Sequence, residues 1–180
     1  MDIFEEIEQN KFVLVLLNEA EYLEQLGKIV KLVEKAEKKI CYVCLSRPYK
    51  NVMDDLKENS IDIKPFFFVD VLSSHYGKPP EKRNCIFVES PKSLEKIRDA
   101  IRKIVEKQRC SVLLFDTISA LLIYQESFSI LHFTNSLFDY KKENVKKIFI
   151  ALKNNDILGG ENTKLVDDLK MFADKTLEVS

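Results

Sequence analysis

Asp116 is the side chain in this sequence whose position most suggests chemistry. It follows four apolar residues, Val112–Phe115. A run of this kind predicts a buried strand, which would deliver the carboxylate to the carboxyl end of a sheet. There it could accept a hydrogen bond from a water molecule bound to Mg²⁺. The alternative is structural: Asp116 or Thr117 would cap a helix over residues 118–124 by accepting hydrogen bonds from its first N–H groups.

Cysteine and histidine give weaker signals. Cys41 and Cys44 form a C-x-x-C pair, a spacing found in zinc sites and redox pairs. The surrounding residues predict a buried strand, however, on which side chains three positions apart point to opposite faces. We therefore interpret these cysteines as free thiols packed in the core. His75 and His132 have no serine or cysteine elbow near them, so no catalytic residue and no metal ligand is predicted.

The elements that would position these residues alternate along the chain. Apolar runs of four to six residues recur, and each is followed by a longer amphipathic stretch. This alternation predicts an α/β fold with three layers, α/β/α, around a mainly parallel central sheet. Residues 73–84 are expected to form an exposed loop, and Ser90 and Pro91 to start the next helix. Strands are expected at residues 12–17, 40–45, 66–71, 85–88, 112–115, 148–152 and 176–179.

Length and charge fit one domain over residues 1–180. The chain has 28 basic and 29 acidic side chains, and its net charge is −1. This balance excludes a globally basic coat protein for nucleic acids. No apolar run reaches the roughly 20 residues that span a bilayer, and the acidic start does not resemble a leader. We therefore expect a cytoplasmic protein without membrane contact.

A sheet of this kind often binds a nucleotide outside the carboxyl ends of its strands. The usual phosphate-binding loop, GxxxxGK[ST], uses glycines so that backbone N–H groups converge on the phosphates. Here the first strand continues into Asn18–Gln25, Tyr22 occupies the position of the first glycine, and Ile29 that of the hydroxyl residue. Three glutamates in this segment would also repel an anion. The sequence therefore disfavours nucleotide binding.

The sequence resembles the RecA superfamily, most closely the archaeal KaiC-like ATPase domains and their relatives without a phosphate loop. Residues 112–124 are similar to the Walker B strand of that family, with Asp116 followed by Thr117 and a leucine-rich helix. Residues 89–101 resemble the segment before it, and residues 172–179 the terminal strand element. The similarity extends from residue 12 to residue 179. It implies a RecA-like fold.

The departures from that family concern catalysis. The phosphate loop would lie at residues 18–25 and is missing, and no acid stands near residues 46–48, where the catalytic glutamates would lie. The resemblance therefore implies a domain that has lost nucleotide hydrolysis and needs no cofactor. RecA relatives form rings or filaments, which makes self-association an expectation, and both a dimer and a hexamer stay open.

Three hypotheses for function follow. The first is a non-catalytic regulatory or interaction module that binds a protein partner or another copy of itself. The second is a nucleotide-binding protein or weak ATPase, with Asp116 on a metal and Lys28 or Lys153 supplying positive charge. The third is a small-molecule sensor, whose ligand would lie at the strand ends near Asn18, Ser46, Asp116 and Thr117.

Nucleic-acid binding is disfavoured. It would require basic side chains to converge on one face of the molecule. The sequence offers only short basic pairs beside acids, namely Lys38–Lys39, Lys141–Lys142 and Lys146–Lys147.

Overall fold

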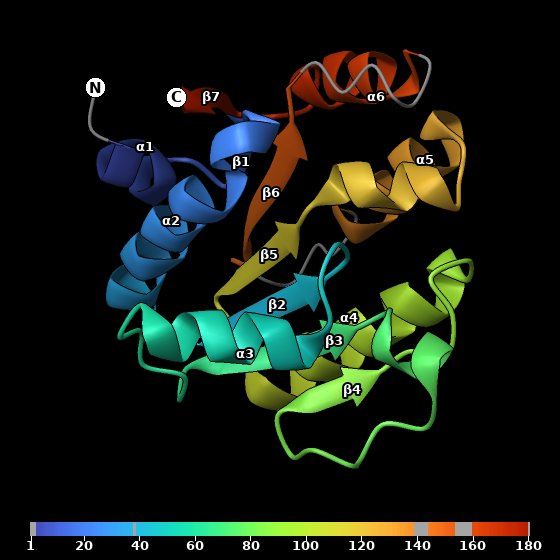
Figure 1. Cartoon of the computed structure of the whole chain (residues 1–180). Helices are drawn as coiled ribbons and strands as arrows, with labels where there is room; N and C mark the ends of the chain where they lie inside the picture. The colour runs from blue at the N-terminus through green and yellow to red at the C-terminus, as the bar shows by residue number, and fades with distance from the viewer. Residues whose placement is uncertain (1–2, 38, 139–143, 154–159, 180) are drawn as a thin grey trace.

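The fold is built on one sheet of seven parallel strands (Figure 1). The computed structural model describes residues 3–37, 39–138, 144–153 and 160–179. The strand order across the sheet is β4-β3-β2-β5-β6-β1-β7. The strands are β1 (Phe12–Leu17), β2 (Ile40–Cys44), β3 (Phe66–Asp70), β4 (Cys85–Phe87), β5 (Val112–Asp116), β6 (Lys146–Leu152) and β7 (Lys175–Val179).

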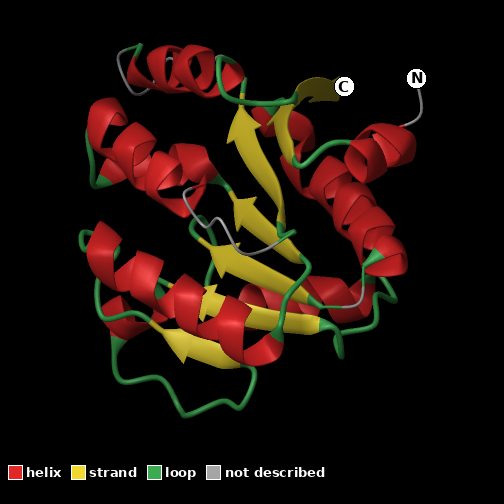
Figure 2. Cartoon of the chain, turned by 180° about the vertical axis from the view of Figure 1, so that it is seen from behind, coloured by secondary structure: helices red, strands yellow, loops and turns green. Residues whose placement is uncertain are grey.

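Helices cover both faces of this sheet, as Figures 1 and 2 show from opposite sides. The buried residues of α1 (Ile3–Gln9), α2 (Tyr22–Ala36) and α3 (Tyr49–Glu58) pack on one face. Those of α4 (Leu94–Gln108), α5 (Ser127–Phe138) and α6 (Glu161–Lys170) pack on the other. The predicted three-layer α/β fold is confirmed. No helix in the described ranges is both long enough and apolar enough to cross a membrane.

Two cores explain why the strands are continuous apolar runs. All six residues of β1 are buried. Alternate side chains enter opposite cores: Leu14 and Leu16 pack with α4, α5 and α6, whereas Val13 and Val15 pack with α1, α2 and α3. A strand covered on both faces has no polar side, so it shows no alternation in sequence.

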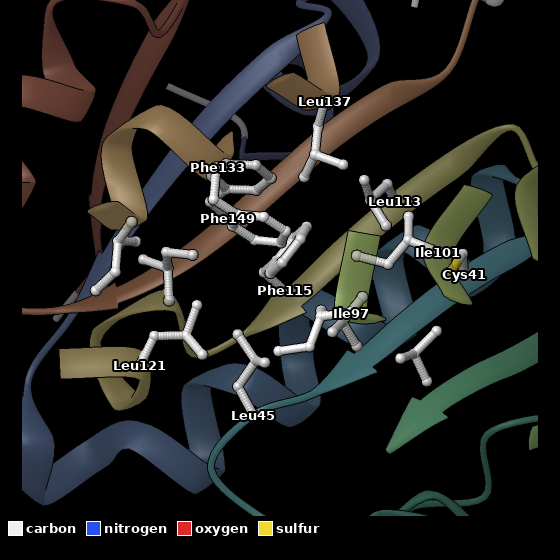
Figure 3. Packing of buried hydrophobic residues seen from close by; sticks show 14 of the residues in the cluster. Cys41, Leu45, Ile97, Ile101, Leu113, Phe115, Leu121, Phe133, Leu137 and Phe149 are labelled. Carbon is white, nitrogen blue, oxygen red and sulfur yellow. The ribbon is translucent and has the colours of Figure 1, made fainter. Parts of the chain in front are cut away.

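Three aromatic rings meet among aliphatic side chains in the core between the sheet and α4, α5 and α6 (Figure 3). Phe115 and Phe149 meet edge to face with ring centroids 4.6 Å apart, and Phe133 of α5 lies 6.2 Å from Phe115. Each fully buried phenylalanine contributes about 1.5–3 kcal/mol through loss of contact with water. These rings attach β5 and β6 to α5 and so support the strand that ends at Asp116.

The cysteine interpretation is confirmed. All four cysteines are free and buried. Cys41 and Cys44 belong to opposite cores, and burial raises the pKa of both thiols. Within the described residues, no group of three or more His, Cys, Asp or Glu side chains could hold a metal ion.

One predicted helix start and one predicted helix type differ from the structure. Ser93, not Ser90, caps α4, because its hydroxyl accepts from the backbone N–H of Lys96 at 3.3 Å. Ser90 instead accepts from the N–H of Lys92 in the preceding turn. The helix predicted over residues 118–124 is a 3-10 helix, η3 (Ile118–Ile123).

Residues 73–84 begin with a short 3-10 helix, η2 (Ser73–Tyr76), and continue as the predicted loop. Another short 3-10 helix, η1 (Glu19–Glu21), precedes α2. Lys38, Lys141 and Lys142, which belong to the basic pairs of the sequence, lie outside the described residues.

Candidate functional site

The carboxyl ends of β2 and β5 form the candidate site. The two strands are neighbours, with Cys44 beside Asp116. After β2 the chain continues to α3 on one face of the sheet, and after β5 it continues to η3 and α5 on the other. Ligands of α/β sheets bind at such switch points, outside the carboxyl ends of the strands.

The Asp116 carboxylate is fully buried here and has several hydrogen-bond donors. The hydroxyl of Tyr22, on α2, donates to its Oδ1 atom, and the hydroxyl of Tyr42, on β2, donates to its Oδ2 atom. Ser46 Oγ lies 3.3 Å from Oδ1, and Arg47 Nη2 lies 3.5 Å from Oδ2. Burial raises the pKa of Asp116 to about 8. We call these five residues the Asp116 cluster.

The cap predicted for Asp116 or Thr117 is wrong. Thr117 stands at the N-cap position of η3, but no side chain caps that helix. The carboxylate of Asp116 points to the tyrosines instead, and its backbone carbonyl accepts from the N–H groups of Leu45 and Ser46 at 2.9 and 3.1 Å. Thr117 is buried, and the peptide bond between the two residues is cis.

Arg47 connects the cluster to α3. Its Nη1 atom forms an ion pair with Asp55, and its buried Nε atom has no hydrogen-bond partner among the described residues. A cavity of about 20 Å³ lies beside it, lined in part by Tyr42, Arg47 and Asp55. This volume accommodates one water molecule, which could satisfy the Nε group.

The four residues predicted to bind a ligand do not all come together. Ser46 and Asp116 are in contact, and Thr117 follows in the chain. Asn18 stands at the N-cap position of η1, where its backbone carbonyl accepts from the N–H of Glu21 at 3.2 Å. The chain therefore passes from β1 through one short 3-10 helix directly into α2.

The cation beside Asp116 is not one that the sequence suggested. Lys28 is exposed and pairs with Glu24 one helical turn away at 2.7 Å. Lys153 pairs with Glu178 of β7 at 3.1 Å. The nucleotide hypothesis assigned the positive charge near Asp116 to Lys28 or Lys153, but Arg47 supplies it instead.

Sequence reasoning missed a second buried carboxylate, Asp70. It lies on the opposite side of β2 from Asp116, at the same level of the sheet, since Cys44 pairs with both. Asp70 accepts from the backbone N–H groups of Tyr49 at 2.7 Å, Leu72 at 2.7 Å and Ser73 at 2.9 Å. The sequence does contain a signal for this residue, because Asp70 ends the apolar run of β3 just as Asp116 ends that of β5. Its contacts anchor the loop after β3 to the start of α3.

No family model and no curated protein sequence matches the chain. Several solved structures, however, have a similar fold. The uncharacterized protein PH0321 from Pyrococcus horikoshii, solved in complex with an unknown peptide, aligns with a TM-score of 0.69 and 15% identity. The alignment covers 98% of this chain and 82% of that one. The KaiC-like protein PH0186 from the same hyperthermophilic archaeon aligns with a TM-score of 0.55 and 13% identity, over 80% of this chain and 62% of that one.

An ATPase from the type III secretion system of pathogenic bacteria aligns with a TM-score of 0.57 and 10% identity, over 93% of this chain and 50% of that one. The fold is RecA-like. The present chain thus spans less than two thirds of the length of either the KaiC-like protein or the secretion ATPase. The RecA-like fold that the sequence resemblance implied is confirmed, and identities this low concern the fold alone.

Proposed function

We propose that this chain is a RecA-like domain that lacks the Walker A loop, does not hydrolyse nucleotide, and acts as a regulatory or protein-interaction module. The observation that carries the proposal is the contact between Tyr22 and Asp116. Tyr22 occupies the position of the first glycine of a phosphate loop, and its hydroxyl binds the carboxylate that would have to serve a metal ion.

The environment of Asp116 supports the same conclusion. Because the pKa of the carboxyl is about 8, the group carries a proton for much of the time near neutral pH. A protonated carboxylic acid is a poor ligand for Mg²⁺, or for its bound water, since both prefer anionic oxygen. The two tyrosines and Arg47 already use both carboxylate oxygens.

The start of α2 supports the absence of phosphate binding. Glu19 and Glu21 lie in η1, and Glu24 lies in the first turn of α2. Negative side chains at this end of a helix compete with any anion for its free N–H groups. A triphosphate would also find no glycine between β1 and Gly27.

An interaction role is favoured by one solved structure. PH0321, which aligns over 98% of this chain, was solved with an unknown peptide. We extend this to the present chain as part of the proposal: a RecA-like domain without nucleotide would act by binding a polypeptide, either a partner or a second copy of itself, in the cytoplasm.

Isothermal titration calorimetry with Mg-ATP and Mg-ADP tests the loss of nucleotide binding. We expect no binding heat at about 1 mM nucleotide, which corresponds to a binding free energy weaker than about −4 kcal/mol. A phosphate-release assay should give the rate of the buffer alone. Micromolar affinity that requires Mg²⁺ and disappears in Asp116→Ala would overturn the proposal and favour the ATPase hypothesis.

Sedimentation velocity tests the interaction role. If self-association is the function, the mean mass should rise between about 1 and 100 µM protein without nucleotide, as micromolar dissociation constants require. A chain that stays monomeric would refute self-association and leave a different protein as the partner.

A small-molecule sensor is the second candidate, and the exposure of Ser46 favours it. Its hydroxyl lies at the switch point between β2 and β5, 3.0 Å from the hydroxyl of Tyr22. A ligand could therefore reach the edge of the Asp116 cluster from solvent. Thermal-shift screening would distinguish the candidates, because a sensor should gain stability from a metabolite and lose that gain in Ser46→Val.

A further inference from the structure

A groove of 470 Å³ lies at the opposite end of the sheet from Asp116. It is bounded by residues 82–86, which lead into the edge strand β4, and by the C-terminal half of α4. Four exposed basic side chains line it, two from each segment, and no acidic side chain does. They are Lys82, Arg83, Lys103 and Lys107.

The charges in this groove lack counter-ions. None of the four basic side chains takes part in an ion pair in the portion of the chain that the structure describes, although acids outnumber bases in the sequence as a whole. Lys39 adds a fifth positive charge, with its Nζ atom 6.0 Å from the ring centre of Phe67, which lines the groove. Like charges held in one concave surface repel one another and attract an anion.

Apolar side chains also line the groove, among them Phe67, Ile86 and Ile104. A ligand that matches both features needs negative charges and apolar groups. The phosphates of a nucleic acid would match the charges, but the Phe67 ring is partly buried and has Lys39 above it, which makes it a poorer stacking surface for a base than an exposed ring.

We propose that this groove binds an extended, acidic segment of a partner polypeptide that also carries apolar side chains. The inference names a partner class for the interaction role proposed above, but it does not depend on the Asp116 cluster, which lies at the other ends of the strands. Its test can therefore fail while the absence of nucleotide binding stands.

Fluorescence anisotropy with labelled peptides tests the proposal on the full chain. The probe is a peptide of about ten residues that alternates aspartate and leucine, which spans about 33 Å when extended. A second peptide replaces leucine with serine, and a single-stranded oligothymidine of similar length carries charge without apolar side chains. We expect the aspartate–leucine peptide to bind most tightly, with affinity falling about tenfold between about 50 and 300 mM NaCl.

A matched pair of variants locates the binding. Lys103→Glu/Lys107→Glu reverses two charges of the groove one helical turn apart on α4. Lys31→Glu/Lys35→Glu makes the same change on exposed residues of α2, on the other face of the sheet. The first variant should lose at least about tenfold in affinity for the aspartate–leucine peptide, and the second should stay within about twofold of the unmodified chain. Circular dichroism verifies that both remain folded.

Three results would overturn the inference. They are a failure of the unmodified chain to bind the aspartate–leucine peptide, an equal loss in both variants, and tighter binding of the oligothymidine than of that peptide. Equal binding of the leucine and serine peptides would remove the apolar part of the proposal.

Discussion

The buried carboxylate of Asp116 makes the stability of this protein depend on pH. Burial raises its pKa from 3.8 to about 8. Between these values the folded chain keeps the proton and the unfolded chain releases it. The folded state then binds more protons than the unfolded state, so the free energy of unfolding falls as pH rises, by about 1.36 kcal/mol per pH unit. From about pH 5 to about pH 7.5 this amounts to about 3 kcal/mol.

Asp116→Asn removes the titrating group and keeps nearly the same shape. The asparagine oxygen can accept from one tyrosine hydroxyl, and its amide can donate to the other. We expect the stability of this variant relative to the unmodified chain to improve by about 3 kcal/mol between about pH 5 and about pH 7.5. Urea denaturation followed by circular dichroism at both pH values measures the difference, and the comparison cancels the titration of all other groups.

Asp54→Asn is the control, since Asp54 is an exposed carboxylate on α3. The difference in free energy of unfolding between this variant and the unmodified chain should be the same at both pH values. If Asp116→Asn also gives a difference that does not change with pH, the carboxylate is ionised in the folded chain, held as an anion by Tyr22, Tyr42 and Arg47. That result would refute both the pH argument and the case against a metal at this position.

Three further substitutions test the packing around the site, each by urea denaturation at neutral pH. Tyr42→Phe removes a buried donor to Asp116 and should lower the free energy of unfolding by about 1–2 kcal/mol; no change would mean that the hydroxyl contributes nothing. Asp70→Ala leaves the N–H groups of Tyr49, Leu72 and Ser73 without an acceptor and should lower the free energy of unfolding by about 3 kcal/mol. Asp70→Asn should lower it less. Phe149→Ala opens a cavity in the aromatic core and should lower it by about 3–5 kcal/mol, whereas a loss below about 1 kcal/mol would contradict the packing described.

The strands could be predicted from the sequence because burial on both faces leaves a continuous apolar run. β1 occupies the predicted residues 12–17. β6 begins two residues earlier than predicted, at Lys146, because Lys146 and Lys147 pair with β5 although their side chains are charged. α1 was not predicted: Ile3 and Ile7 lie one turn apart and pack on the same core, but seven residues are too few to establish a helical period.

The site was only partly predictable. Ser46 and Asp116 follow apolar runs, so their place at strand ends could be read directly. Tyr42 could not, because a tyrosine inside an apolar strand is indistinguishable from any core residue, and its hydroxyl partner lies 74 positions away in the chain. Tyr22 is separated from Asp116 by 94 positions. The pairing of β2 with β5 brings Tyr42 to Asp116, and the position of α2 on the sheet brings Tyr22 there.

The position of β1 in the sheet also matters while the protein is being made. β1 lies between β6 and β7, in register with residues 147–152 and 175–179 (Figure 1). Among the described strands, the first to be synthesised therefore pairs only with the last two. At about 5–20 residues per second, its six apolar side chains wait roughly 8–30 s for both neighbours. A nascent chain of this topology therefore exposes an unpaired apolar segment through most of its synthesis, and such segments promote aggregation.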